Sequence, residues 1–183
     1  MKHMFDKRIL GLLLAALSLA ACTDKGPGGS TAPAPKNSGA DTLQATPDIE
    51  QMKNKLLASQ NDFSSLSRLA DRYFEAGQYL KAIQAYNKAL AIDPSSADCL
   101  NDRGLAQYYT GDPDAALKSI DQAIASDPGY VHAWLSKGYV LVSEGRYDEA
   151  KVALNKVKEL DQSGTLAAEA DKFLARIAAA GGN

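Results

Sequence analysis

Apolar side chains in the second half of the chain recur at intervals of three or four residues, which is the spacing of one helix face. One stripe contains Leu66, Leu69, Ala70 and Tyr73, and a second contains Tyr79, Ala82, Ile83, Tyr86, Ala89 and Leu90. Gly77 separates the two stripes and suits the left-handed residue that ends many helices. Asp93-Pro94 follows the second stripe, and a residue before proline is disfavoured in a helix. The pattern predicts two helices joined by a tight turn.

This two-helix pattern repeats along the chain with a constant offset. The aligned positions are Leu66, Leu100 and Trp134; Ala70, Gly104 and Gly138; Gly77, Gly111 and Gly145; and Ala82, Ala116 and Ala150. Pro94 and Pro128 close the first two units, and Gln162 stands at that place in the third. A fixed period of this length indicates a repeat architecture, with units at 63–96, 97–130 and 131–164.

Local signals refine these units. Asp112 is a predicted N-cap, because Pro113 suits the first helical position. Gly104 and Gly138 are expected to lie opposite Ala116 and Ala150, so that paired helices approach closely. Further helices are predicted at 47–60 and 165–180, from apolar faces that contain Ile49, Met52, Leu56 and possibly Leu57 in the first, and Leu166, Ala170, Phe173, Leu174 and Ile177 in the second. The later helix is expected to cap the array, since a terminal repeat otherwise exposes its apolar side.

The first 46 positions have a different composition. A short, mostly basic segment precedes the apolar and small side chains of Ile9–Ala21, a run shorter than the roughly 20 residues that span a membrane. Residues 1–21 therefore read as a secretory signal. Residues 22–46 are rich in Gly, Pro, Ser, Thr and Ala, and this composition predicts a flexible tether. The predicted folded domain is 47–180.

The signal ends in Leu-Ala-Ala-Cys, which resembles the lipobox of bacterial lipoproteins. The resemblance implies that Cys22 carries a thioether-linked lipid and begins the mature chain. An ordinary signal peptide cut nearby, or an uncleaved anchor, remains an alternative. Thr23 follows the cysteine where some families carry an inner-membrane retention signal. We therefore expect an envelope location, at the outer membrane facing the periplasm if the host has two membranes.

Composition narrows the function. Apolar residues make up 45% of the 183 and charged residues 23%, with a net charge of -2. Nothing in this balance argues for a nucleic-acid partner. Two cysteines, Cys22 and Cys99, form neither a disulfide framework nor a zinc site. No nucleophile–base pair, phosphate loop or metal-ligand cluster is visible. The many carboxylates include no pair with a convincing environment, so we expect no enzymatic activity, cofactor or metal.

The repeating pattern resembles that of tetratricopeptide repeat proteins, which carry Trp, Leu-Gly, Tyr, Ala-x3-Phe and Pro at fixed places. The third unit has Trp134, Gly138, Tyr147 and Ala150 at such places. The resemblance implies an all-α fold, a right-handed α-solenoid of three repeats. Arg103 and Lys137 replace the usual Leu, and their stems are expected to cover apolar surface. Pro113 replaces the usual Tyr.

In this family the first helix of each unit lines a groove. Carried over by position, the predicted groove residues are Arg68, Asp71, Phe74, Asn101, Leu105, Tyr108, Tyr109, His132, Leu135, Tyr139 and Val142. The chaperone-binding branch uses Lys, Asn and Arg to clamp a carboxylate. Those positions here hold Ser67, Asp71, Asp102, His132 and Ser136, which argues against acidic peptide tails. An apolar, aromatic strip is expected to face water, and such patches mark interaction sites. The strip consists of Phe74, Leu105, Tyr108, Leu135 and Tyr139.

The sequence thus predicts a membrane-anchored adaptor that binds a peptide or helix of another envelope protein. Pilus assembly, outer-membrane protein insertion and cell-wall scaffolding use lipoproteins of this plan, and no residue selects among them. The alternative is a self-associating structural lipoprotein, whose groove holds its own helix or a second copy in a homodimer.

Overall fold

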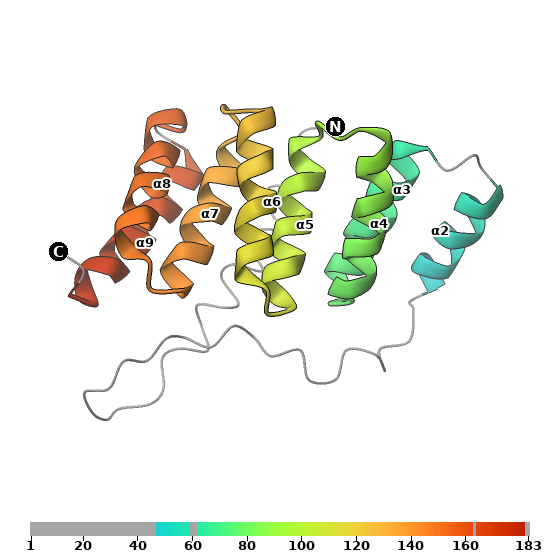
Figure 1. Cartoon of the computed structure of the whole chain (residues 1–183), viewed down its shortest axis with the longest axis horizontal. Coiled ribbons are helices and arrows are strands. Elements are labelled where there is room, and N and C mark those ends of the chain that lie inside the picture. Colours follow the sequence, from blue (N-terminus) through green and yellow to red (C-terminus); the bar gives the residue numbers. More distant parts are fainter. Residues whose placement is uncertain (1–46, 59–61, 163, 182–183) are drawn as a thin grey trace, which may run out of the picture. The chain divides into compact units, whose positions relative to one another are not determined.

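The computed structural model describes residues 47–58, 62–162 and 164–181, which lie in one compact unit, 31–183. These residues form α-helices joined by turns, without a β-strand among them (Figure 1). The helices are α2 (Pro47–Ala58), α3 (Phe63–Glu75), α4 (Tyr79–Ile92), α5 (Ala97–Tyr109), α6 (Pro113–Ser126), α7 (Val131–Ser143), α8 (Tyr147–Leu160) and α9 (Thr165–Ala179). The predicted all-α fold is confirmed. The predicted signal, Cys22 and the tether 22–46 lie outside the described residues.

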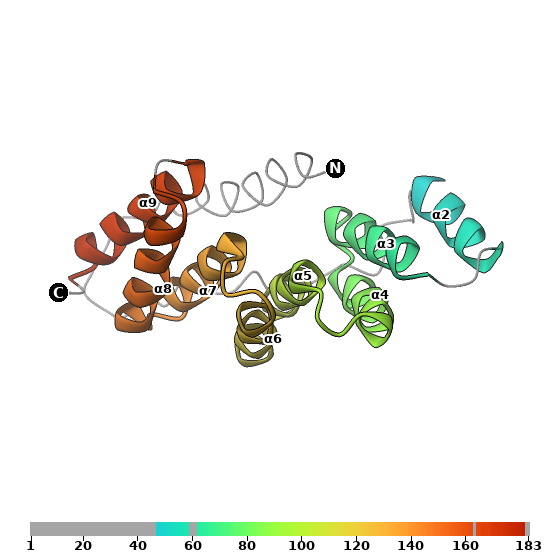
Figure 2. The ribbon, with the colours of Figure 1, turned by 90° about the horizontal axis from the view of Figure 1, so that it is seen from above.

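Each repeat is a helical hairpin whose turn contains a left-handed glycine. Gly77, Gly111 and Gly145 have φ angles of 71°, 87° and 74°. Helices α3 and α4 pack together, as do α5 with α6 and α7 with α8, and each second helix also contacts the next first helix. Figure 2 shows α3 and α5 on one side of the array and α4 and α6 on the other. Helix α5 contacts both α3 and α7, and α7 contacts α9, so the first helices form one layer.

Side-chain caps fix where several helices begin. Asp112 accepts a hydrogen bond from the backbone N–H of Ala115 at 2.9 Å, and Pro113 occupies the first turn, as predicted. Asp62 caps α3 in the same way through Ser65, also at 2.9 Å. Asp93, which precedes a proline, is extended, with φ -124° and ψ 91°. Capping satisfies N–H groups that a helix start would otherwise leave without partners.

Two glycines allow paired helices to approach closely. A Cβ added at Gly104 would lie 2.7 Å from Cγ1 of Ile120 and 2.9 Å from the backbone oxygen of Ala116. A Cβ added at Gly138 would lie 2.5 Å from Cδ2 of Leu154. Gly104 thus faces Ala116, as the sequence predicted. The obstacle at Gly138 is Leu154, one turn beyond the predicted Ala150.

Each flanking helix packs against the repeats through buried apolar side chains. Ile49 of α2 is 1% exposed, and α2 packs against α3. Helix α9 packs against α8 and α7, and its Phe173 and Ile177 are buried. No helix in the described ranges is both long and apolar enough to cross a bilayer.

The basic residues that depart from the family pattern form specific polar contacts. Arg103 donates to Ser119, Asn87 and Gln122 at 3.2, 3.1 and 2.9 Å. These three partners lie on α6, α4 and α6, so one guanidinium on α5 joins helices of two repeats. Lys137 pairs with Asp121 at 2.7 Å. The hydrogen-bond and ion-pair partners of Arg103 and Lys137 were not predicted from the sequence.

Candidate functional site

The predicted groove residues lie on α3, α5 and α7, and most of them are buried. The buried ones are Phe74, Asn101, Leu105, Tyr108, Tyr109, Leu135, Tyr139 and Val142. Arg68 is exposed, and Asp71 and His132 are half-buried. The expectation that the apolar strip faces water is therefore wrong for this structure, in which Leu105 is only 2% exposed. The predicted groove residues that remain accessible, Arg68, Asp71 and His132, are polar.

The aromatic side chains of this layer contact one another in series. Tyr109 stacks on Tyr79 with ring centroids 4.8 Å apart, and it meets Phe74 edge-on at 5.9 Å. Tyr108 meets Tyr139 edge-on at 5.3 Å. Burial raises the pKa of Tyr109 to about 12. Edge-to-face and offset pairs stabilise beyond the area that they bury, so these rings help to hold successive repeats together.

The chain's own C-terminal helix meets the end of this series. The ring of Phe173 on α9 lies 5.9 Å from that of Tyr139 on α7. Phe173 stands one full period after Tyr139, at the same place in the repeat. Helix α9 therefore continues the layer of first helices as the opening half of a further repeat.

Three carboxyl groups lie near one another on the same layer and are called here the acidic cluster: Asp71, Asp98 and Asp102. The hydroxyl of Tyr86 donates to Asp71 at 2.9 Å, and that of Tyr130 donates to Asp98 at 2.7 Å. Asp102 accepts from the Asn101 amide at 3.0 Å. The sequence search for catalytic carboxylates missed this cluster, because its members come from two helices.

Burial dominates the electrostatics of the acidic cluster. The pKa of Asp102 is raised well above its usual value, first by loss of water and then by the charges of Asp98 and Asp71. Burial, followed by the Asp102 charge, also raises the pKa of Tyr130. Loss of water and nearby negative charge both disfavour the ionised forms of Asp102 and Tyr130.

Cys99 lies beside the acidic cluster, and its thiol is expected to be unreactive. Its thiol donates to the hydroxyl of Ser67 at 3.4 Å, and burial raises its pKa to about 11. Because a thiolate is the reactive form, this cysteine is held in its unreactive form. The structure places it as a packing residue.

Some buried polar atoms on the same layer have no hydrogen-bond partner among the described residues. They include Oδ1 of Asn101 and Oγ of Ser136. Asn101 is 0% exposed and Ser136 is 1% exposed. Ser136 occupies in α7 the position that Asp102 occupies in α5, one period earlier. A buried polar group without a partner is costly and needs an explanation.

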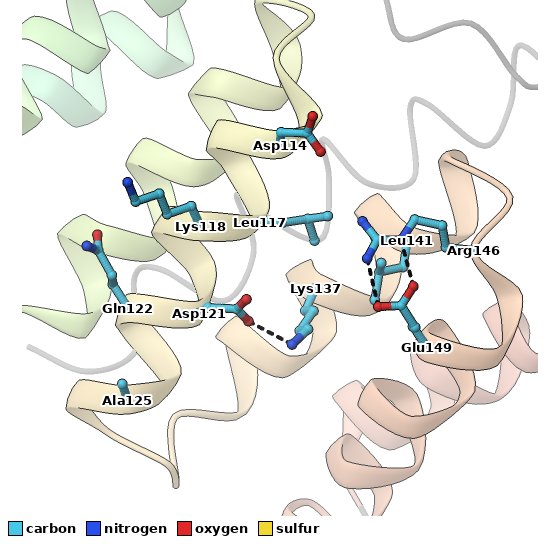
Figure 3. Close-up of a pocket in the computed structure, with 10 residues that line it drawn as sticks. All are labelled: Asp114, Leu117, Lys118, Asp121, Gln122, Ala125, Lys137, Leu141, Arg146 and Glu149. Carbon is cyan, nitrogen blue, oxygen red and sulfur yellow. Dashed lines mark hydrogen bonds and ion pairs between the residues drawn. The ribbon is translucent and has the colours of Figure 1, made fainter.

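A separate hollow of about 520 Å³ lies among α6, α7 and α8 (Figure 3). Charged side chains around it pair with one another, as Lys137 does with Asp121 and Arg146 with Glu149, each at 2.7 Å. These exposed pairs satisfy their own charges. Across the described ranges, moreover, no three His, Cys, Asp or Glu side chains are arranged to hold a metal ion.

Comparison with known proteins identifies the repeats. Residues 70–111 match a family model described as TPR repeat, and residues 101–164 match one described as tetratricopeptide repeat. The small glutamine-rich tetratricopeptide repeat-containing protein 2 of Mycosarcoma maydis is 33% identical over 108 residues, which are 57% of this chain and 31% of that protein. The chain spans a third or less of the length of the curated relatives that it matches.

Solved structures agree in fold. The first TPR of Spaghetti (RPAP3), bound to the HSP90 peptide SRMEEVD, is 23% identical with a TM-score of 0.61, covering 68% of this chain and 97% of that one. The second TPR domain of human RPAP3, in complex with the HSP70 peptide SGPTIEEVD, is 26% identical with a TM-score of 0.56, covering 61% and 91%. The chain is a member of the tetratricopeptide repeat family.

Proposed function

We propose that this protein is a non-catalytic adaptor, which binds a segment of another protein on the layer formed by α3, α5 and α7. The observation that carries the proposal is the repeat array, in which α3, α5 and α7 form one layer. A tetratricopeptide repeat domain 26% identical to this chain has been solved in complex with a peptide. The accessible groove residues on this layer, Arg68, Asp71 and His132, are polar and could contact a bound segment.

The family likeness supports a peptide as the ligand, and the residues argue against the peptides named above. Both of those peptides end in Glu-Glu-Val-Asp. Two of the clamp positions here carry Asp71 and Asp102, which supply no positive charge for such a tail. Ser67 and Ser136 carry no positive charge to attract it. The partner of this chain therefore has a different charge pattern.

The proposal places this adaptor at a membrane of the bacterial envelope, through lipid on Cys22. Residues 22–46 would then link the lipid to α2. As a random coil, such a tether spans roughly 25–30 Å between its ends. That reach suits a partner in pilus assembly, outer-membrane protein insertion or cell-wall machinery, close to the membrane surface.

Site-specific crosslinking in intact bacteria tests the binding face. A photoreactive amino acid at exposed Arg68 should yield a crosslinked partner, whereas the same amino acid at exposed Lys118, on α6, should not. Equal partner yields at both positions, or no partner at either, would refute this face as the binding site. A product of twice the chain's mass, formed from position 68 alone, would favour the self-associating alternative.

Metabolic labelling with a fatty-acid analogue tests the membrane attachment independently. The wild-type chain should incorporate the label, and a Cys22→Ala variant should lose it. Labelling that persists in the variant would place the lipid elsewhere, and an unlabelled wild-type chain would refute the anchor while leaving the adaptor role intact.

A further inference from the structure

Two carboxylates and one amide oxygen on α5 accept fewer hydrogen bonds than they can. Asp98 accepts from Tyr130 through one oxygen, and Asp102 accepts from Asn101 through one oxygen. An ionised carboxylate has room for about four hydrogen bonds. The Asn101 amide nitrogen donates to Asp102, and the Asn101 oxygen has no partner among the described residues. These oxygens could accept hydrogen bonds from a ligand.

Two members of the acidic cluster, Asp98 and Asp102, form no ion pair with Lys or Arg within the described ranges. The ion pairs there involve carboxylates such as Asp121, which contacts Lys137 on the opposite side of the repeat. Buried carboxylates are ordinarily paired with a cation or bound to a metal. A metal is disfavoured, because the described side chains offer no three-ligand arrangement for one.

The two carboxylates are also placed so that one cation can reach both. Asp98 and Asp102 are four residues apart on α5, which puts them on one helix face with Cβ atoms about 5–6 Å apart. Asp98, in the first turn of α5, is half-buried, and Asp102, one turn further on, is 5% exposed. The hydroxyl of Tyr130 donates a hydrogen bond to Asp98, and the centroid of the Tyr130 ring lies 5.6 Å from that of His132. These rings offer π faces to a cation.

We propose that the partner presents a basic segment, one lysine or arginine side chain of which enters beside Asp98 and binds both Asp98 and Asp102. This proposal rests on the adaptor function and names its ligand class. An ammonium group brings three donors and a guanidinium five, which match the unmet acceptors. Hydrogen bonds between such cations and carboxylates are about twice as strong as neutral ones.

Binding should release a proton. In the free chain, burial and neighbouring negative charge favour the neutral form of Asp102, as its raised pKa records. An entering cation favours the charged form. Calorimetry at pH 5 in two buffers with different heats of ionisation should therefore report proton release on binding, which a purely apolar contact would not produce.

Panning a random twelve-residue phage library on the full chain, held in detergent, provides the test. We expect the bound peptides to be enriched at least threefold in Lys and Arg at one position. The preference should disappear with the D102N variant and persist with D148N, a matched change at a side chain that is 95% exposed on α8. A synthetic peptide with the selected sequence should bind at least tenfold more weakly to D102N and within twofold of wild type to D148N.

The remaining outcomes separate the two proposals. Enrichment of peptides without a basic preference would refute the cation site and leave the adaptor function standing. Absence of any enrichment over empty beads would refute both. Selected peptides that match segments of this chain would overturn the proposal in favour of self-occupancy. Thermal unfolding monitors whether D102N folds, and D98N provides a second variant whose equal affinity for the basic peptide would also overturn the assignment.

Discussion

Replacing Gly104 by alanine tests the close approach of α5 and α6. The new Cβ would lie 2.7 Å from Ile120 Cγ1 and 2.9 Å from the Ala116 backbone oxygen. Comfortable contact begins near 3.5 Å, so α6 would have to move by about 0.6–0.8 Å. Ile120 and Ala116 are both fully buried, and a backbone oxygen cannot rotate away. Overpacking of this kind costs about 1–3 kcal/mol, and a rigid obstacle places the cost in the upper part of that range.

Alanine also favours the helix over glycine by about 1 kcal/mol, so we expect a net loss of about 1–2 kcal/mol in the free energy of unfolding. Urea unfolding followed by circular dichroism at 222 nm measures it. The exposed Asn155→Ala on α8 isolates the propensity gain and should raise stability by about 0.5 kcal/mol. If Gly104→Ala were as stable as the wild type or more so, the close contact between these helices would be refuted.

Three further predictions concern charge, capping and thiol chemistry. The folded state raises the pKa of Asp102, so the native chain binds more protons than the unfolded chain, and the contribution of Asp102 to stability falls as pH rises above about 4. In urea titrations, the stability advantage of D102N over the wild type should therefore be near zero at pH 3.5 and grow towards pH 7. An advantage independent of pH would contradict this. Asp112→Ala removes the cap on Ala115 and should lower the free energy of unfolding by about 1 kcal/mol, whereas an unchanged urea midpoint would show that the cap is dispensable. In a Cys22→Ser chain, the Cys99 thiol with its pKa of about 11 should react with Ellman's reagent at pH 8 about 100-fold more slowly than after unfolding in urea, and rapid reaction in the native chain would contradict its placement.

The fold was predictable because its signals are local and recur. Apolar spacing located the helices, and Gly77 and Asp93-Pro94 marked where the first two stop. Repetition at a constant offset then gave three independent readings of the same hairpin. Phe173 shows that the period could have been followed further, since it stands one period after Tyr139. That continuation would have indicated that α9 joins the layer of first helices.

Burial of the aromatic strip was less accessible to sequence reasoning. Periodicity shows which residues share a helix face, but it does not show how deeply neighbouring side chains cover that face. Tyr109 illustrates the difference, because its ring is stacked on Tyr79, which begins the second helix of the preceding repeat. A residue assigned to a groove by its position in the family pattern can thus be taken up by packing between repeats.

The properties of the acidic cluster could not be predicted from the positions of its residues in the sequence. Asp98 and Asp102 are visibly four residues apart, and on a solvated helix such a pair would be ordinary. The tertiary structure makes the pair unusual, because Asp102 is buried and accepts a hydrogen bond from the neutral Asn101 amide, whose own oxygen has no partner among the described residues. A guanidinium facing this cluster could have neutralised it, yet Arg103 points to Ser119, Asn87 and Gln122 instead. Helix α5 thus directs its only basic side chain to the opposite layer and its carboxylates to the proposed binding layer, a charge separation that favours a cationic partner over an acidic one.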